Sequence, residues 1–292
     1  MAHPDRPNRT GEYVVLDGDV LPTTAARISV LDRGLLRGEG VFETIRTYAG
    51  VPFAVSRHLA RMHQSAAAAG IRLPPDPALV DAIIAACAAN GFAETRVHLT
   101  VTGGPGGPAP DPTGDVEPTT IAIAGEIRDP EGVAEVTAVT LPWVRHEGAA
   151  LTGVKPTSYL DHLIGHKWAL SHGADEGLWR NSAGDVTEAT GSNLFVVRAG
   201  VVSTPPVAAG LLPGVTRDLV LERCLARGVP AEESTLAVAD LVGADECFLT
   251  STTKEAVAVT VVDGHRIGAG AHPVVDAIVA DWRRWAPAHP EG

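Results

Sequence analysis

Two turn signals in the first fifty residues constrain the fold more than any other feature of this sequence. An Asp-Gly pair at 17–18 interrupts the strand-like stretch EYVVLDGDVL, and an Ala-Gly pair at 49–50 interrupts VFETIRTYAGVPFAV. Because Gly next to a small or acidic residue favours a tight two-residue turn, both stretches are predicted to be antiparallel hairpins. A helix with Ser56 as its N-cap is predicted to end near Gly70, and a second helix is predicted to end at Gly91.

The rest of the chain mixes strands and helices without a regular strand–helix–strand repeat. The segments RVHLTVT and TTIAIAG are predicted to be strands, separated by the Gly/Pro-rich loop GGPGGPAPDPTGD. The pattern resets around 125–133, where we place a domain boundary. Helices are predicted over 158–172 and 216–227, and a last helix is predicted before DWRRW. The fold class is therefore α+β, and a doubly wound parallel sheet is not expected.

Composition and charge exclude several classes of protein. The 292 residues carry a net charge of -12 and no Lys/Arg-rich run, which argues against nucleic-acid or anionic-membrane binding. Cys87, Cys224 and Cys247 are widely spaced, so neither a disulfide framework nor a structural zinc site is expected. No apolar run is long enough to cross a bilayer, and the first residues lack the apolar core of a signal peptide. We expect a cytoplasmic protein.

Lysine is almost absent from this chain. Lys155, Lys167 and Lys254 are the three lysines among 23 basic residues. An exposed lysine can be replaced by arginine at little cost, since surface ion pairs are weak. A lysine that acts as an amine nucleophile cannot, because arginine stays protonated and forms no Schiff base. Lys155, in GVKPTSYLDH, is followed by a proline that favours an extended conformation. By itself it remains either a surface lysine or a nucleophile.

A second segment, residues 187–218, contains groups that suit a phosphate and a ring nitrogen. Its end, LLPGVTRD, is predicted to begin a helix whose first free amides belong to Val215 and Thr216. A helix start offers free N–H groups and a positive dipole end, which together favour an anion. Glu188 lies just before a predicted strand among small and apolar residues. It is either a solvated strand-end carboxylate or the partner of a protonated ring nitrogen.

In this segment the sequence resembles the class IV, or fold-type IV, pyridoxal-phosphate-dependent aminotransferases. That family includes branched-chain and D-amino-acid aminotransferases and aminodeoxychorismate lyases. The resemblance extends from ISVLDRGLLRGEGVFETIR through RHLARMHQSA to ADECFLTSTTKE and VVDG. The family pattern is met in full by Glu188, Thr190, Asn193, Leu194, Phe195, Val202, Thr204, Leu212, Gly214, Val215 and Arg217.

The resemblance implies a fold and an assembly. It implies a small N-terminal α/β domain over 10–125, a linker over 126–132, and a larger C-terminal domain over 133–286 that binds the cofactor. The larger domain is expected to be built around a mixed, β-barrel-like sheet. Members of the family are usually dimers, so a homodimer is expected.

The resemblance also assigns a pyridoxal 5'-phosphate site. It implies that Lys155 is the catalytic residue, which forms the internal aldimine and moves the proton, and that Tyr159 hydrogen-bonds the phenolic oxygen of the cofactor. Glu188 would hold the pyridine nitrogen protonated, so that the ring withdraws electrons. Arg61 would bind the phosphate. The other residues that the family pattern places at the cofactor are Asn193, Val215, Thr216, Thr252 and Thr253.

The substrate pocket departs from the better-known members of the family. RVH at 96–98 replaces the YIR tripeptide of branched-chain enzymes, and GGPGGPAPDP lacks the arginine of D-amino-acid enzymes. Arg37 stands where relatives show an aromatic residue, and it is either a clamp for a substrate carboxylate or a surface or interface arginine. The candidate substrate contacts are Arg37, Phe42, Arg96, His98 and Arg145.

Three activities are compatible with these residues to different degrees. We expect an aminotransferase that moves an amino group between an amino acid or amine and a 2-oxo acid. The close alternative is a 4-amino-4-deoxychorismate lyase that releases pyruvate and 4-aminobenzoate. A distant alternative is a metal-dependent hydrolase, because His162 and His166 have zinc-ligand spacing on a predicted helix. HLIGH lacks the glutamate of an HExxH site, and no metal is expected.

Overall fold

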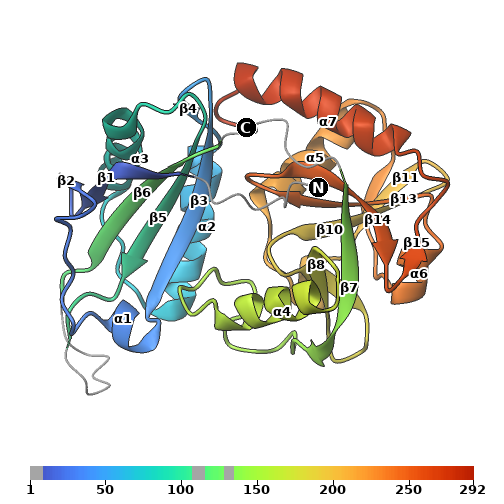
Figure 1. The fold of residues 1–292 in the computed structure, drawn as a ribbon, viewed down its shortest axis with the longest axis horizontal. Coiled ribbons are helices and arrows are strands. Elements are labelled where there is room, and N and C mark those ends of the chain that lie inside the picture. The colour runs from blue at the N-terminus through green and yellow to red at the C-terminus, as the bar shows by residue number, and fades with distance from the viewer. Residues whose placement is uncertain (1–8, 107–115, 128–134) are drawn as a thin grey trace. The chain divides into compact units, whose positions relative to one another are not determined.

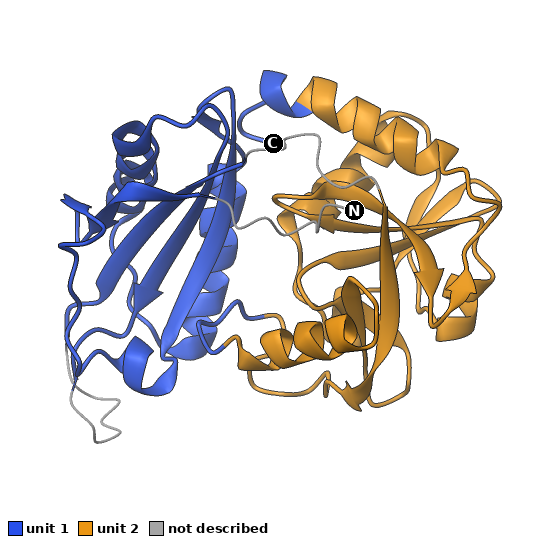
Figure 2. Cartoon of the chain, in the orientation of Figure 1, with its two compact units in different colours: residues 1–130, 154–158, 286–292 blue, residues 131–153, 159–285 orange. Residues whose placement is uncertain are grey.

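The computed structural model describes residues 9–106, 116–127 and 135–292. The chain divides into two compact units (Figure 2). Unit 1 contains Met1–Pro130, Val154–Ser158 and Ala286–Gly292, and unit 2 contains Glu131–Gly153 and Tyr159–Trp285. The linker expected over 126–132 and most of the loop GGPGGPAPDPTGD lie largely outside the described residues.

Unit 1 contains a six-stranded antiparallel sheet covered on one face by two helices (Figure 1). The strand order is β2-β1-β6-β5-β3-β4. The strands are β1 (Thr10–Leu16), β2 (Asp19–Pro22), β3 (Gly40–Tyr48), β4 (Val51–Pro52), β5 (Thr95–Thr102) and β6 (Thr119–Glu126). The helices are α1 (Arg33–Arg37), α2 (Val55–Ala69) and α3 (Asp76–Asn90).

Alternation along β3 and β5 explains how this sheet divides its side chains. Val41, Ile45 and Val97 point to the face covered by α2 and α3, where they join a buried apolar core with Met62 and Leu79. A strand presents successive side chains to opposite faces, so Phe42 and Thr44 of β3 and His98 of β5 face away from that core. The two predicted hairpins are confirmed as the β1–β2 and β3–β4 pairs.

The start of α2 differs from the prediction. The N-cap predicted at Ser56 is wrong, because the helix already begins at Val55 and Ala54 occupies the cap position. Ala54 has a left-handed backbone (φ 53°), and its amide donates to the Pro290 carbonyl at 2.6 Å. Ala54 has no side-chain group that could accept from the first amides of the helix. The helix ends at Ala69, before Gly70, as predicted.

Unit 2 contains a nine-stranded mixed sheet of which six strands form a closed ring. β10 pairs with β13, and the ring continues through β14, β7, β8 and β9 back to β10. β7 runs parallel to both β14 and β8, whereas β9, β10 and β13 pair antiparallel. This mixed barrel confirms the α+β prediction. The strands are β7 (Glu135–Val144), β8 (Glu176–Arg180), β9 (Val186–Ala189), β10 (Asn193–Arg198), β11 (Val201–Thr204), β12 (Ala231–Glu233), β13 (Glu246–Ser251), β14 (Glu255–Val262) and β15 (His265–Arg266).

Four helices belong to unit 2, and one of them differs from the prediction. They are α4 (Leu160–Ser171), α5 (Val215–Ala226), α6 (Val238–Val242) and α7 (Pro273–Trp285). The prediction that α7 ends before DWRRW is wrong, because these residues form its last turns. Trp282 is buried there, and its burial stabilises the helix end. At the other end of α7, the buried Glu246 carboxylate accepts from the Val274 and Val275 amides.

Candidate functional site

Lys155 is held in unit 1 by the free edge of β3. The Lys155 carbonyl accepts from the Phe42 amide at 3.0 Å, and the Thr157 amide donates to Gly40 at 2.8 Å. The short segment Val154–Ser158 therefore extends the sheet of unit 1, although the family resemblance assigned Lys155 to the larger C-terminal domain. The Lys155 amide donates to Ser65 Oγ of α2 at 3.1 Å. The lysine backbone is thus fixed by both the sheet and a helix.

The amine of Lys155 lies over the ring of Phe42. Its Nζ is 4.3 Å from the centroid of the Phe42 ring, a cation–π distance. His98 stacks on Phe42 with ring centroids 4.5 Å apart. Burial lowers the pKa of His98 to about 4, and the positive charges of Lys155 and Arg96 add to this effect. Lys155, Phe42 and His98 are therefore neighbours, as a shared site requires.

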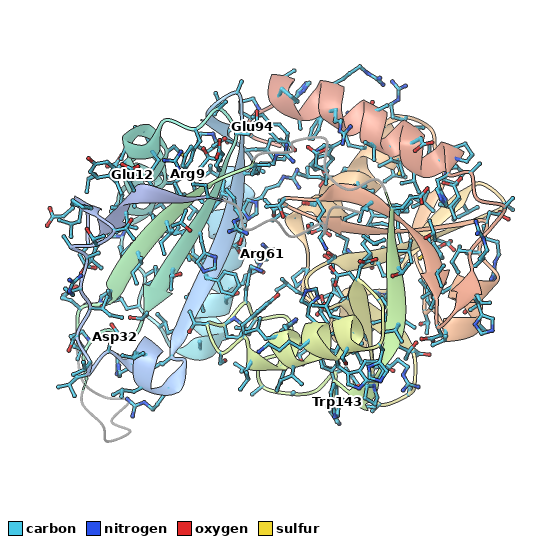
Figure 3. The ribbon with its side chains drawn as sticks, viewed as in Figure 1. Arg9, Glu12, Asp32, Arg61, Glu94 and Trp143 are labelled. Atoms are coloured by element: carbon cyan, nitrogen blue, oxygen red, sulfur yellow. The ribbon has the colours of Figure 1, made fainter. Side chains whose placement is uncertain are left out.

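A buried ion-pair cluster lies on the face of β3 that is covered by helices. Arg61 of α2, labelled in Figure 3, donates from Nε to Glu43 Oε1 at 2.8 Å and from Nη2 to Oε2 at 2.7 Å. His58 Nδ1 lies 2.8 Å from the same Oε2. Burial opposes the charge on Glu43, but Arg61 and His58 outweigh it and hold the pKa of this carboxyl well below its usual range. Burial lowers the pKa of His58.

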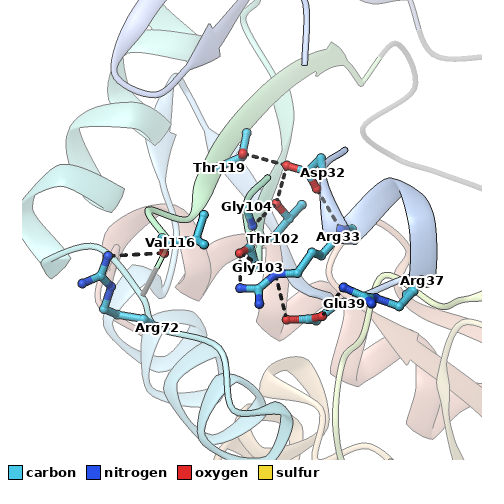
Figure 4. Close-up of polar contacts among 11 residues, drawn as sticks. Asp32, Arg33, Arg37, Glu39, Arg72, Thr102, Gly103, Gly104, Val116 and Thr119 are labelled. Carbon is cyan, nitrogen blue, oxygen red and sulfur yellow. Dashed lines mark hydrogen bonds and ion pairs between the residues drawn. The ribbon is translucent and has the colours of Figure 1, made fainter. Parts of the chain in front are cut away.

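Arg37 ends a short helix that a buried aspartate anchors (Figure 4). Asp32 accepts from Gly34 N at 2.8 Å, Thr102 Oγ1 at 2.9 Å and Thr119 Oγ1 at 2.7 Å. Arg37 Nη2 lies 3.8 Å from Glu39 Oε2, and its side chain is about one quarter exposed (27%). The structure thus supplies an intramolecular partner for Arg37, while its substrate role stays a prediction.

In unit 2 the ring of strands closes at two predicted site residues. The β9–β10 contact pairs Glu188 with Asn193. Both side chains are buried, and Glu188 Oε2 accepts from the Leu212 amide at 3.1 Å and from Asn193 Nδ2 at 3.5 Å. Its Oε1 accepts from Arg145 Nη1 at 2.5 Å. The strand-end carboxylate is therefore enclosed rather than solvated.

Helix α5 begins where the sequence predicted it. Gly214 is its N-cap, and Val215 and Thr216 are its first residues. A Cβ on Gly214 would lie 1.9 Å from Asn193 Oδ1, so only glycine fits between the asparagine and the helix. Asn193 Nδ2 in turn donates to Leu212 O at 2.9 Å. One asparagine thus fixes both the helix start and the loop before it.

Hydroxyl side chains lie at or beside the paired ends of β10 and β13, where Asn193 is opposite Thr250; the resemblance assigned two of them and not the other two. Thr252 and Thr253 follow β13 and are half-buried. Ser192 Oγ and Thr250 Oγ1 are buried without a hydrogen-bond partner in the described part of the chain. Sequence reasoning missed both, although Ser192 adjoins Asn193 and Thr250 lies two residues before Thr252.

Tyr159 and His162 form a stacked pair at the start of α4. Their ring centroids are 4.1 Å apart with an interplanar angle of 4°. His162 Nδ1 lies 2.8 Å from the Thr190 carbonyl oxygen, and Tyr159 Oη lies 3.5 Å from it. Among the described residues no group of three His, Cys, Asp or Glu side chains could hold a metal ion. The hydrolase alternative built on His162 and His166 therefore gains no support.

A comparison with family models covers both the residues around Lys155 and the residues around Glu188. The model of the family described as amino-transferase class IV matches residues 40–262. The chain belongs to the class IV aminotransferases. The matched range contains Lys155, Glu188 and the α5 helix start.

Relatives of this class IV aminotransferase carry two kinds of name. A provisionally named branched-chain-amino-acid aminotransferase of Methanocaldococcus jannaschii is 35% identical over 87% of this chain and 89% of its own length. The D-alanine aminotransferase of Bacillus licheniformis is 33% identical over 88% of this chain and 91% of its own length. Both names describe aminotransferases.

Solved structures share the fold of this class IV aminotransferase. The branched-chain aminotransferase of Escherichia coli superposes with a TM-score of 0.89 at 26% identity and covers 95% of both chains. The T.th. branched-chain enzyme, solved with pyridoxamine 5'-phosphate, has a TM-score of 0.90 at 26% identity, covering 96% of this chain and 95% of its own. A protein of Legionella pneumophila provisionally named as a 4-amino-4-deoxychorismate lyase has a TM-score of 0.83 at 26% identity, covering 90% and 96%.

The described residues contain no helix that is both long and apolar enough to cross a membrane.

Proposed function

We propose that this class IV aminotransferase uses pyridoxal 5'-phosphate to move an amino group between an amino acid or amine and a 2-oxo acid. The observation that carries the proposal is the position of Lys155. Its backbone is fixed by β3 and Ser65, and its amine lies over Phe42. The other two lysines have different surroundings: Lys254 pairs with Glu176, and Lys167 is exposed on α4.

The donors and acceptors of unit 2 fit this cofactor. A phosphate needs several N–H and O–H donors, and the start of α5 supplies the amides of Val215 and Thr216 with a positive dipole end. The hydroxyl of Thr252 and the unpartnered buried hydroxyl of Thr250, both within the described residues, add donors of the right type. The buried Glu188 carboxylate is an acceptor for a ring N–H. The residues present therefore match the group chemically.

Each residue has a proposed role. Lys155 carries the cofactor and, once released, moves a proton, since an amine held at one place serves as a general base. The phosphate is bound by Arg61 together with Val215, Thr216, Thr252 and Thr253. The bonds of Arg61 to Glu43 use two of its five guanidinium N–H groups. Tyr159 binds the phenolic oxygen, and Asn193 holds Glu188. When bound, the cofactor withdraws electrons from the substrate carbon.

The substrate side of the proposal is drawn from unit 1. Phe42 and His98 lie next to the Lys155 amine, and Arg96 is close enough to lower the pKa of His98. Arg96 and His98 share a face of β5, because they are two residues apart on a strand. We propose that this face contacts the substrate, with Arg96 or Arg37 binding its carboxylate.

Assembly as a homodimer completes the proposal. Helix α4 exposes large apolar side chains, with Leu160 63% exposed, Leu163 48% and Ile164 42%. Trp143, labelled in Figure 3 at the end of β7, is 42% exposed. Apolar residues gathered on one helix are typical of an interface between subunits. Sizing at micromolar concentration is expected to give twice the 30.3 kDa chain mass.

Trapping of the cofactor tests the central proposal. The protein incubated with pyridoxal phosphate is expected to turn yellow, and borohydride is expected to fix the cofactor on Lys155, as peptide mass spectrometry can locate. K155A is expected to lose the trapped adduct, whereas K167A, a change of an exposed lysine on α4, is expected to keep it. A colourless wild type that takes up no pyridoxal phosphate would contradict the proposal.

A test with amino donors then distinguishes transamination from the lyase reaction. The lyase is the second candidate because a structural relative from Legionella carries that provisional name. Conversion of the bound cofactor to its pyridoxamine form by an L- or D-amino acid is expected. Failure with every amino acid, together with pyruvate release from aminodeoxychorismate, would replace the aminotransferase by the lyase.

A further inference from the structure

The carboxylate of Glu188 has partners of two kinds. Oε2 accepts from two neutral donors, the Leu212 amide at 3.1 Å and Asn193 Nδ2 at 3.5 Å. Oε1 accepts from the charged guanidinium of Arg145 at 2.5 Å. The side chain of Glu188 is only 5% exposed and that of Arg145 is 22% exposed. This ion pair is therefore shielded from solvent on the carboxylate side.

Arg145 is held in place by its own surroundings. Its amide donates to the Arg180 carbonyl at 2.9 Å, just beyond the end of β7. Its guanidinium lies 5.8 Å from the centroid of the Trp179 ring. Backbone pairing and the aromatic face together aim the guanidinium at Glu188, so the contact is built by the barrel and not by a loose surface side chain.

Three other ionisable side chains near Glu188 have hydrogen-bond partners of their own. Glu176 of β8 accepts from Thr190 Oγ1 at 2.6 Å and pairs with Lys254. His162 of α4 bonds the Thr190 carbonyl, and Arg180 Nη2 donates to the Leu141 carbonyl at 3.3 Å. Arg145, in contrast, bonds the Glu188 carboxylate directly.

We propose, on the basis of the proposed function, that Arg145 is a positioning residue that lowers the proton affinity of the Glu188–ring-nitrogen pair and does not contact the substrate. A cation at hydrogen-bond distance stabilises the carboxylate anion, which makes it a weaker proton acceptor. The same cation repels a protonated ring. A glutamate without this arginine would hold the ring proton to higher pH.

The ring nitrogen itself reports the effect. The protein is loaded with pyridoxal phosphate labelled with ¹⁵N in the ring, and its ¹⁵N shift is followed against pH by solid-state NMR. In R145Q the midpoint of the ring-nitrogen titration is expected to rise by about one pH unit or more, which is a tenfold gain in proton affinity. R145K keeps the charge and is expected to stay close to wild type. R223Q, which removes an arginine that pairs with Asp281, is the matched control and is expected to leave the midpoint unchanged.

Identical ring-nitrogen shifts in wild type and R145Q at every pH where both stay folded would overturn the inference. If R145Q does not fold, R145A with added millimolar guanidinium replaces it, and restoration of the wild-type midpoint is expected; a midpoint that ignores guanidinium would count against the inference. Failure of the wild type to take up labelled cofactor would instead overturn the proposed function, so the two failures are distinguishable.

Discussion

Glu43 and Arg61 form a doubly hydrogen-bonded ion pair in which the carboxylate is fully buried and His58 supplies a third contact. The pair joins β3 to α2 on the core side of the strand that holds Phe42 and Lys155. Burial of two charges is costly unless each has a partner, so neither residue tolerates the loss of the other.

Removal of Glu43 is therefore expected to destabilise the protein strongly. E43A leaves Arg61 buried without its partner, and breaking a buried pair from one side costs about 3–5 kcal/mol. E39A, which removes a carboxylate that is about one third exposed (31%), is the control and is expected to cost about 1 kcal/mol or less. Urea unfolding measures both. A loss for E43A no larger than for E39A would show that the pair contributes little.

His98 makes stability depend on pH. Its pKa is about 4 in the folded protein and near its ordinary value of 6.5 when unfolded. Between these values the unfolded chain binds more protons, so this contribution to stability is complete above about pH 6.5 and is lost as pH falls toward 4. The loss amounts to about 2 kcal/mol after allowance for partial exposure. His58, whose pKa is also lowered by burial, acts in the same direction.

H98F removes the titrating group while keeping an aromatic ring against Phe42. As the pH is lowered from 6.5 to 4, the free energy of unfolding of H98F is expected to fall less than that of wild type. These two pH values are the pKa values of His98 in the unfolded and folded protein. Parallel pH profiles for the two proteins would exclude His98 as the source.

Gly214 tolerates no side chain. In G214A the new Cβ would meet Asn193 Oδ1 at 1.9 Å, so the asparagine or the start of α5 has to move. Overpacking of this kind costs about 1–3 kcal/mol, and we expect a weaker affinity for pyridoxal phosphate as well. G191A, where a Cβ would meet nothing within 4 Å, is the matched control. Fluorescence titration with the cofactor and thermal unfolding compare them; equal affinities would contradict the role given to the α5 start.

Lys254 compensates a second buried carboxylate. Glu176 is 3% exposed and accepts from Lys254 and from Thr190 Oγ1, so K254M leaves its charge with a single neutral donor. We expect a loss of about 1–3 kcal/mol in the free energy of unfolding. K167M changes an exposed lysine of the same unit and is expected to cost less than about 0.5 kcal/mol. Equal losses would rule out the compensation.

Local patterns in the sequence were enough to predict the hairpins, most helices and the α+β class, because turn residues and periodicity are properties of neighbouring residues. The helix start at Val215 was also predictable, since Pro-Gly before a helical pattern marks an N-terminus. Where the cap position is occupied by a residue without a capping side chain, as at Ala54, the same local rules placed the N-cap two residues late. The end of α7 was missed because Trp282 is stabilised by tertiary burial.

Part of the candidate site was predicted from the sequence, and part was seen only in the tertiary structure. From the sequence, the family resemblance predicts that Lys155, Glu188 and Arg61 belong to one cofactor site, and these assignments stay a prediction. Only the tertiary structure showed that Lys155 is added to the edge of β3 and that Arg145 binds Glu188. Phe42 and Lys155 are 113 positions apart in the sequence, and Arg145 and Glu188 are 43 positions apart. Strand pairing and ion pairing across such separations depend on how the sheets close, which no local pattern encodes.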